Sequence, residues 1–270
     1  MFRLLTRAPA LLVLIAALPG GRCPAQAEPP ALLAMEPIVT DRPDFTESAE
    51  TVPAGRSQLE GGYTFGRTSN ERARTLGELL LRVATGPRAE IRVGVPSYVG
   101  TRGPGGAAAT GFVDASLGFK VKLRDRSEGY GLRGRPDIAL IGALTLPTGG
   151  RAYRENNLQP QGKLCLGWEL SPNVAFSSNL NYAWASEEGE RFGQVSASGS
   201  LGFGLNERVG AYLEYFGTYP GGKDGSDANY LNGGLTYLVN NDYQLDARAG
   251  QGLNGIRDDY FIGFGASRRF

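Results

Sequence analysis

The chain has 270 residues, with 28 basic and 27 acidic residues, 40 glycines and no histidine. Without histidine, the usual general base, the usual zinc ligand and every Ser-His or Cys-His nucleophile pair are excluded. The nearly balanced charge also excludes a strongly basic nucleic-acid binder, so we expect no nucleic-acid partner.

The first 27 residues have the pattern of a secretory signal peptide. Arg3 and Arg7 give a positive start, an apolar run follows from Leu11 to Leu18, and Ala25-Gln26-Ala27 is a small-x-small cleavage site. We therefore predict that residues 1–27 are removed and that the mature chain is exported.

The two cysteines fit this interpretation. Cys23 lies inside the predicted signal peptide, and Arg22 stands where a lipidated cysteine needs a small residue before it, so an ordinary signal is preferred to a lipoprotein signal. Only Cys165 would remain after cleavage, which excludes an intrachain disulfide.

From residue 57 to the end, apolar and polar residues alternate with a period of two, which is the signature of strands with one apolar face. No run of eighteen apolar residues follows the signal peptide, so no transmembrane helix is expected. We predict about twelve strands, around residues 59–65, 79–83, 91–95, 113–123, 138–146, 164–170, 174–184, 195–205, 209–215, 231–239, 243–249 and 260–270.

The predicted connections alternate between short and long. Tight turns are expected at 171–173, 206–207 and 240–241, with a nearly tight one at 85–88. Longer Gly-rich and charged connections are expected at 67–75, 97–110, 149–156, 186–191, 217–228 and 250–258, and 124–135 is a long exception on the short side. Even strand number with one short and one long end is typical of an antiparallel up-and-down barrel of the bacterial outer membrane, here residues 57–270.

The charges are sorted onto one face of the predicted strands. The apolar faces carry no charge except Arg268, close to the end of the chain. Because lipid excludes charge, we expect the polar faces to line the lumen, either as cross-strand ion pairs or as a constriction that selects solutes. The lumen candidates are Glu78, Arg82, Glu90, Arg92, Asp114, Lys120, Lys122, Asp137, Lys163, Glu169, Glu214, Asp246 and Arg248.

Three stretches resemble a known family. Residues 38–48 (IVTDRPDFTES), 52–63 (VPAGRSQLEGGY) and 144–150 (LTLPTGG) are similar to segments of an outer-membrane β-barrel family of transporters that is filed under the MetA pathway of phenol degradation. The resemblance implies a channel that moves small molecules, aromatic or hydrophobic compounds among them, into or out of the cell. The terminal Phe270 matches the aromatic end by which the barrel-assembly machinery recognises such proteins.

Residues 28–56 precede the first strand, and we expect them to form a periplasmic N-terminal segment. One hypothesis makes them a plug, in which Asp41, Arg42, Asp44 and Glu47 pair with charged residues of the lumen. The alternative, favoured from sequence alone, is a solvated leader that caps the mouth of the barrel.

An enzyme and a structural barrel are the other classes to consider. Some twelve-stranded outer-membrane barrels are lipases that use Ser with His, but Ser116 and Ser198 have no histidine to activate them, so no catalytic residue is assigned. A barrel whose loops bind a partner, without transport, stays open as an alternative. We expect no metal ion and no cofactor, and we expect outer-membrane lipid and a small-molecule solute as partners.

Overall fold

The computed structural model describes residues 36–126, 129–187, 189–221, 227–254, 256 and 259–270, so the predicted signal peptide lies outside the described residues. Within them, the one helical element is a single 3₁₀ turn, η1 (Pro104–Gly106), and no helix is long and apolar enough to cross a membrane. The strands are β1 (Ser57–Arg67), β2 (Arg72–Gly86), β3 (Ala89–Gly94), β4 (Tyr98–Arg102), β5 (Ala108–Phe112), β6 (Ala115–Arg124), β7 (Asp137–Leu146), β8 (Gln159–Ser171), β9 (Val174–Glu187), β10 (Glu190–Gly204), β11 (Val209–Pro220), β12 (Ala228–Asn240), β13 (Tyr243–Leu253) and β14 (Tyr260–Arg269).

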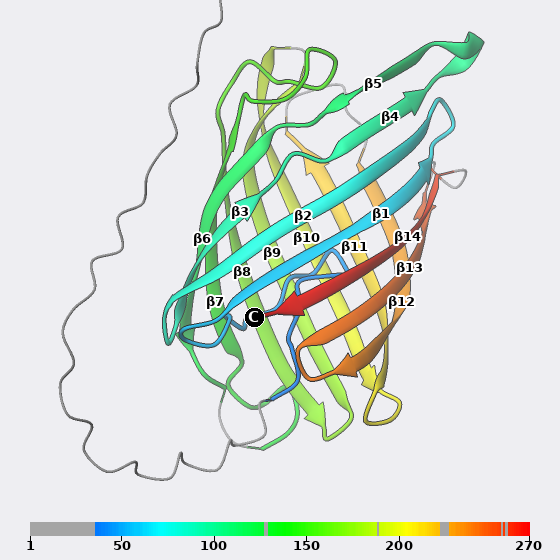
Figure 1. Cartoon of the computed structure of the whole chain (residues 1–270). Helices are drawn as coiled ribbons and strands as arrows, with labels where there is room; N and C mark the ends of the chain where they lie inside the picture. The colour runs from blue at the N-terminus through cyan, green and yellow to red at the C-terminus, as the bar shows by residue number, and fades with distance from the viewer. Residues whose placement is uncertain (1–35, 127–128, 188, 222–226, 255, 257–258) are drawn as a thin grey trace, which may run out of the picture. The chain divides into compact units, whose positions relative to one another are not determined.

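These strands form one closed antiparallel barrel (Figure 1). The first strand pairs with the last, with Tyr63 of β1 opposite Phe264 of β14, and β1 also pairs with β2, which closes the ring. Among the described strands, β5 alone has a single partner strand, β4. Closure pairs the backbone groups of neighbouring barrel strands with one another, as a hydrocarbon environment requires. The predicted fold class is therefore confirmed.

The fourteen strand segments make twelve barrel strands because two of the strands are interrupted. Strand β2 pairs with β4 through residues 72–76 and with β3 through residues 80–86. On the next strand, β5 pairs with β4 and β6 pairs with β3. Pro96 lies in the gap between β3 and β4, and proline has no N–H to donate to the ladder there.

The barrel has its polar side chains inside and its apolar side chains outside. On β6, Leu117 and Phe119 are 52% and 53% exposed, whereas Lys120 is completely buried. The same inversion recurs around the ring, since Glu60 and Arg82 are completely buried while Phe264 is 59% exposed. A barrel in water would reverse this distribution, and a barrel in lipid requires it.

Three of the long connections expected from the sequence are wrong. Ser186 and Glu187 of β9 pair with Arg191 and Glu190 of β10, so the connection between these strands is shorter than the expected 186–191. Residues 72–75 pair with 64–67, so the connection from β1 to β2 is only 68–71. Residues 98–112 form the β4–β5 hairpin, which extends past the other strands in Figure 1. Its two strands are only five residues long, YVGTR and AATGF, and combine glycine, alanine and threonine with few large apolar residues, so the alternation that identifies strands is weak there.

The other connections follow the predicted asymmetry. At one end of the barrel the turns 87–88, 172–173 and 241–242 are two residues long, and 125–136 is the long exception. At the opposite end the connection 147–158 is the longest of the set. We call the first of these the short-turn end.

Candidate functional site

Residues 36–56, here called the luminal segment, run inside the ring of strands (Figure 1). The backbone N–H of Asp41 donates to the Glu60 carboxylate on β1, at 3.0 Å. The backbone N–H of Glu47 donates to Asn179 on β9, at 2.7 Å. Strand β9 lies half-way round the ring from β1, so the segment crosses the lumen. This placement differs from the solvated leader that the sequence favours.

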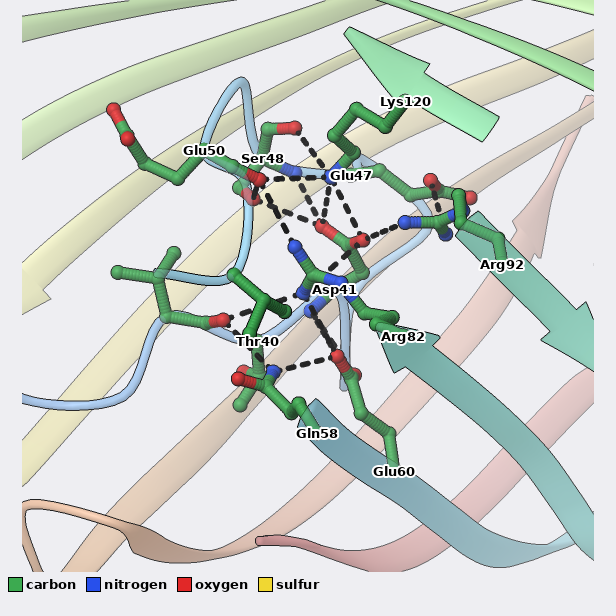
Figure 2. Close-up of polar contacts among 12 residues, drawn as sticks. Thr40, Asp41, Glu47, Ser48, Glu50, Gln58, Glu60, Arg82, Arg92 and Lys120 are labelled. Carbon is green, nitrogen blue, oxygen red and sulfur yellow. Dashed lines mark hydrogen bonds and ion pairs between the residues drawn. The ribbon is translucent and has the colours of Figure 1, made fainter. Parts of the chain in front are cut away.

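Asp41 lies at the centre of the contacts between the segment and the wall (Figure 2). The Lys120 ammonium donates to both oxygens of its carboxylate, at 2.9 and 2.8 Å. The guanidinium groups of Arg92 and Arg82 lie 2.6 and 3.3 Å from the second oxygen. Ser48 of the segment itself donates its N–H and its hydroxyl to the first oxygen. Three wall cations therefore hold one buried carboxylate.

Two wall carboxylates hold the arginines in place. Arg82 donates to Glu60 at 2.9 Å and to Glu90 at 2.8 Å. Arg92 also donates to Glu90, at 2.9 Å. Glu90 and Glu60 in turn accept backbone N–H groups of the segment, from Val52 in the first case and from Asp41 in the second. The arginines are thus oriented by groups of the wall as well as by the segment.

Glu47 and Glu50 of the segment pair with the same side of the lumen as Asp41. Glu47 accepts from Arg92 and from Lys163 on β8, each at 2.8 Å. Glu50 accepts from Lys122 on β6 at 2.6 Å. Strands β2, β3, β6 and β8 therefore present a predominantly basic surface to the acids of the segment.

Arg42 of the segment is bound by acidic residues of the wall. Its guanidinium donates to Glu78 on β2 at 2.6 Å and to Asp246 on β13 at 3.2 Å. Arg248 on β13 donates to the carbonyl oxygen of Pro43 at 2.8 Å. Adjacent residues of the segment, Asp41 and Arg42, are thus held by groups of opposite sign.

Glu214 on β11 binds the turn of the segment by its backbone. It accepts the N–H of Phe45 at 2.9 Å and the N–H of Thr46 at 2.6 Å, and Asn232 donates to it at 2.8 Å. Asp44 lies just before this turn, and among the described residues no ion pair joins it to a wall cation. Burial and the charge of Glu214 raise the pKa of Asp44 well above its usual value.

The pKa values of Asp41 and Glu47 are lowered, in contrast to that of Asp44. Burial opposes the ionisation of Asp41, but the charges of Arg82, Lys120 and Arg92 outweigh it and hold the pKa of that carboxyl well below its usual range. Burial also opposes the ionisation of Glu47, yet Arg92 and Lys163 lower its pKa to about 2. Both carboxylates are charged at neutral pH, and their ion pairs are intact there.

An aromatic stack continues from the segment along the wall. The ring of Phe45 stacks on Phe216 of β11, with centroids 4.6 Å apart and planes 8° apart. Phe216 stacks in turn on Tyr230 of β12 at 5.0 Å, and Phe261 of β14 lies tilted against both wall rings. The Arg248 guanidinium lies 5.4 Å from the centre of the Phe261 ring. The stack therefore brings four aromatic rings together, one from the segment and three from the wall.

Three further apolar residues of the segment are buried. Ile38 and Val52 are 5% and 2% exposed, and Ala49 is buried against Ala139 and Ile141 of β7 and Cys165 of β8. At the short-turn end, a cavity of about 790 Å³ lies between the segment and the strand ends, lined by Lys122, Trp168 and other residues. The wall and the segment therefore do not fill the lumen at this end.

The structure brings most of the lumen candidates against the luminal segment, namely Glu78, Arg82, Glu90, Arg92, Lys120, Lys122, Lys163, Glu214, Asp246 and Arg248. Three others lie elsewhere. Asp114 falls in the gap between β5 and β6 and accepts the N–H groups of Gly149 and Glu155 in the long connection. Asp137 and Glu169 pair with Arg126 at the short-turn end.

The chain was compared with families of known proteins. The family model described as "Putative MetA-pathway of phenol degradation" matches residues 40–270. The chain belongs to this family. The resemblance inferred from residues 38–63 and 144–150 is thereby confirmed, and the match includes most of the luminal segment as well as the barrel. No curated protein sequence is significantly similar to the chain.

Solved structures share the fold of this family member. The COG4313 outer membrane channel from Pseudomonas putida F1 is 15% identical, with a TM-score of 0.64 over 82% of this chain and 98% of that chain. The NanC porin is 12% identical, with a TM-score of 0.50 over 78% and 98%. The translocator domain of the autotransporter NalP from Neisseria meningitidis is 11% identical, with a TM-score of 0.50 over 80% and 88%. At these identities the likeness concerns the barrel alone.

Several polar residues of the site were not singled out from the sequence. The missed residues are uncharged or lie at the start of the first strand: Gln58, Glu60, Asn179, Ser198 and Asn232. Gln58 and Asn232 lie opposite the lumen candidates Arg82 and Glu214 on neighbouring strands, and Asn179 and Ser198 lie opposite each other. Glu60 is two residues from Gln58 on the polar face of β1. Including the charged residue of β1 and extending the polar-face criterion to amides and hydroxyls would have found them.

Proposed function

We propose that this protein is a passive channel of the bacterial outer membrane for small molecules and that the luminal segment narrows its passage. The observation that carries the proposal is the inverted barrel, with charges inside and leucine and phenylalanine outside, crossed by a polar segment. The predicted signal peptide supports export, and the exposed apolar belt supports insertion into lipid. Phe270, the last residue, is the proposed signal for the barrel-assembly machinery.

The contacts of the luminal segment suit a displaceable constriction. They are mainly ion pairs and hydrogen bonds, such as those of Asp41, Arg42 and Glu47. The apolar contacts beside them come from four side chains, namely Ile38, Phe45, Ala49 and Val52. Water and polar solutes can replace such contacts, whereas a large apolar interface would resist separation. We propose that solutes pass when part of the segment leaves the wall.

Aromatic or hydrophobic compounds are the proposed solutes. The stack of Phe45, Phe216, Tyr230 and Phe261 supports this class, because a planar ring can take the place of Phe45 against Phe216. The family description points in the same direction. Passive movement along a gradient permits uptake and efflux alike.

Liposome swelling tests the proposal. Vesicles that contain the full protein are diluted into neutral sugars, phenolic acids or hydrophobic aromatics, and permeation of at least one class is expected. A variant without residues 36–48 is the comparison, and we expect larger single-channel conductance for it. Permeation of none of the solutes by either form would favour a structural barrel without transport. If the deletion leaves the conductance unchanged, the claim that the luminal segment narrows the passage is contradicted.

Hydrolysis is the remaining alternative. The chain contains no histidine, so Ser198, which accepts a hydrogen bond from Thr46, has no imidazole to activate it. Incubation of the folded protein with phospholipid and detection of released fatty acid tests this alternative directly.

A further inference from the structure

The wall groups that hold Asp41 make a compact receptor for one carboxylate. Lys120 donates to both oxygens, Arg92 and Arg82 approach the second oxygen, and the side chains of Lys120 and Arg82 are completely buried (Figure 2). Charge-assisted hydrogen bonds of this kind are roughly twice as strong as neutral ones. We call Arg82, Arg92 and Lys120 the cationic cradle.

The cradle has an excess of positive charge that the wall does not balance. Its three cations face two wall carboxylates, Glu60 and Glu90, and both of these pair with the arginines. In the part of the chain that the structure describes, the side chain of Lys120 donates only to the luminal segment, namely to Asp41 and to the carbonyl oxygens of Ser48 and Glu50. One negative charge from outside the wall is therefore needed.

The two arginines of the cradle are also oriented without Asp41. The Glu60 and Glu90 carboxylates fix both guanidinium groups from the side of the wall, at 2.8–2.9 Å. Preformed donors lose little side-chain entropy when a ligand enters, which favours binding. Movement of the segment away from the wall would therefore uncover two arginines already oriented for an anion and would release the Lys120 ammonium from its contacts with the segment.

We propose that the cationic cradle is a binding site for the carboxylate of small organic acids, and that such a solute replaces Asp41 as it passes. This inference rests on the proposed function and adds a solute class to it. A carboxylate is favoured because the side chain that now fills the site is one, and because two oxygens are bound there by donors from different strands. The Asp41 side chain is thus a built-in competitor of the solute.

Chemical rescue of the full-length variant Asp41→Ala tests the cradle. The substitution removes one carboxylate and leaves space for formate. Thermal unfolding in detergent at pH 7 is followed in sodium formate, sodium acetate and sodium chloride of equal ionic strength. We expect Asp41→Ala to lose stability in chloride and to regain most of the lost Tm in formate or acetate, with a smaller response in the wild type. Equal Tm values in formate and chloride would overturn the proposal.

Asp242→Ala is the matched control. Asp242 pairs with Arg56 and Arg269 in a turn at the short-turn end, and its side chain is 40% exposed. Removal of this carboxylate takes an acidic partner from two arginines but leaves no enclosed site. Formate should therefore not restore the Tm of Asp242→Ala. Rescue of equal size in this variant would show a general salt effect and would overturn the proposal.

A second variant covers the case in which Asp41→Ala does not fold. Asp41→Ser removes the charge, keeps a small polar side chain and leaves space for formate, and its refolding yield is compared in formate and chloride. A higher yield in formate supports the cradle, and equal yields contradict it.

The proposed function is measured separately. In planar bilayers, benzoate should interrupt the current through the wild-type channel more often than benzyl alcohol, and Lys120→Met should abolish the difference. No current in any form would contradict the channel but leave the rescue result standing. Current without a preference for benzoate would contradict the cradle alone.

Discussion

The ammonium of Lys120 lies 2.8 and 2.9 Å from the two carboxylate oxygens of Asp41, although 79 residues separate them in sequence and both side chains are buried. One belongs to the wall of the barrel and the other to the segment inside it. Weakening this ion pair should therefore weaken the binding of the segment to the wall.

Replacement of Lys120 by methionine should loosen the segment. The substitution keeps much of the side-chain length but leaves the Asp41 carboxylate with one cation fewer in a buried site. Breaking a buried ion pair typically costs about 3–5 kcal/mol. We expect a lower Tm and a higher single-channel conductance. Lys122→Met is the control. Lys122 pairs with the more exposed Glu50 and Asp125 and with Asp137, which also pairs with Arg126, so its replacement should change both quantities less.

Much of the barrel could be predicted from the sequence because a strand has a short and simple period. The run around Lys120 alternates strictly, so its charged face and its lipid face can both be assigned from residue order. The β4–β5 hairpin was missed because its glycines and alanines carry little information about faces. Pro96 indicates that the strand is interrupted, but it does not indicate that strand pairing resumes at β4.

The docking of the luminal segment could not be predicted in the same way. An ion pair between Asp41 and Lys120 depends on the closure of the whole ring, and no local pattern encodes it. The composition of residues 36–56 is equally compatible with a solvated leader. What selects the observed placement is the excess of buried positive charge on β2, β3, β6 and β8, which only three-dimensional pairing reveals.

A disulfide should lock the segment to the wall. A Cβ atom built at Gly167 of β8 would lie 4.0 Å from the Cβ of Ala49, within the range of about 3.5–4.5 Å that disulfides require. We predict that Ala49→Cys with Gly167→Cys, in a Cys165→Ala background, forms this bond on oxidation. Channel openings should become rarer when the protein is oxidised and should return with a reductant.

Each single-cysteine variant in the same background is the control for the disulfide. Neither can form the cross-link, so neither should respond to the reductant. If the oxidised double variant conducts as well as the reduced one, residues near Ala49 do not move during opening.

The conductance should depend on pH in two opposite ways. The pKa of Glu47 is lowered from 4.5 to about 2 and that of Asp41 is lowered too, so their contribution to docking is complete above pH 4.5 and is lost as the pH falls towards 2. Asp44 has a raised pKa, so its charge weakens docking at high pH and its protonation strengthens docking as the pH falls. We expect the lowest conductance at mildly acidic pH and a rise below pH 4.5.

The variant Asp44→Asn separates these two effects. It removes the charge whose pKa is raised, so conductance should be lower than that of the wild type at neutral pH and should lose its dependence on pH above 4.5. The rise at lower pH should stay, because it belongs to Asp41 and Glu47. A variant with the full pH profile of the wild type would show that Asp44 does not influence docking.

The aromatic stack should affect aromatic solutes more than sugars. Phe216→Leu keeps an apolar side chain but removes the face on which Phe45 lies at 4.6 Å. Aromatic stacking contributes about 0.5–1.5 kcal/mol beyond buried area, which corresponds to a change of a few-fold to about tenfold in occupancy. We expect permeation of phenolic solutes relative to sugars to fall by that factor in liposome swelling. Phe203→Leu, on the outer face of β10, is the control and should leave the ratio unchanged.

A charge on the outer face should reveal whether lipid surrounds the barrel. Leu235 lies near the middle of β12 and is 54% exposed, with Ala211 and Ala247 opposite it on the two neighbouring strands. In a bilayer, Leu235→Arg should reduce the free energy of unfolding by about 2–4 kcal/mol, whereas Leu205→Arg, in a turn at the short-turn end, should cost about 0–1 kcal/mol. Urea unfolding in lipid vesicles measures both values. In water, an exposed arginine would change stability by only about 0.5 kcal/mol at either position. Equal costs at Leu235 and Leu205 would therefore contradict the membrane-spanning orientation of the barrel.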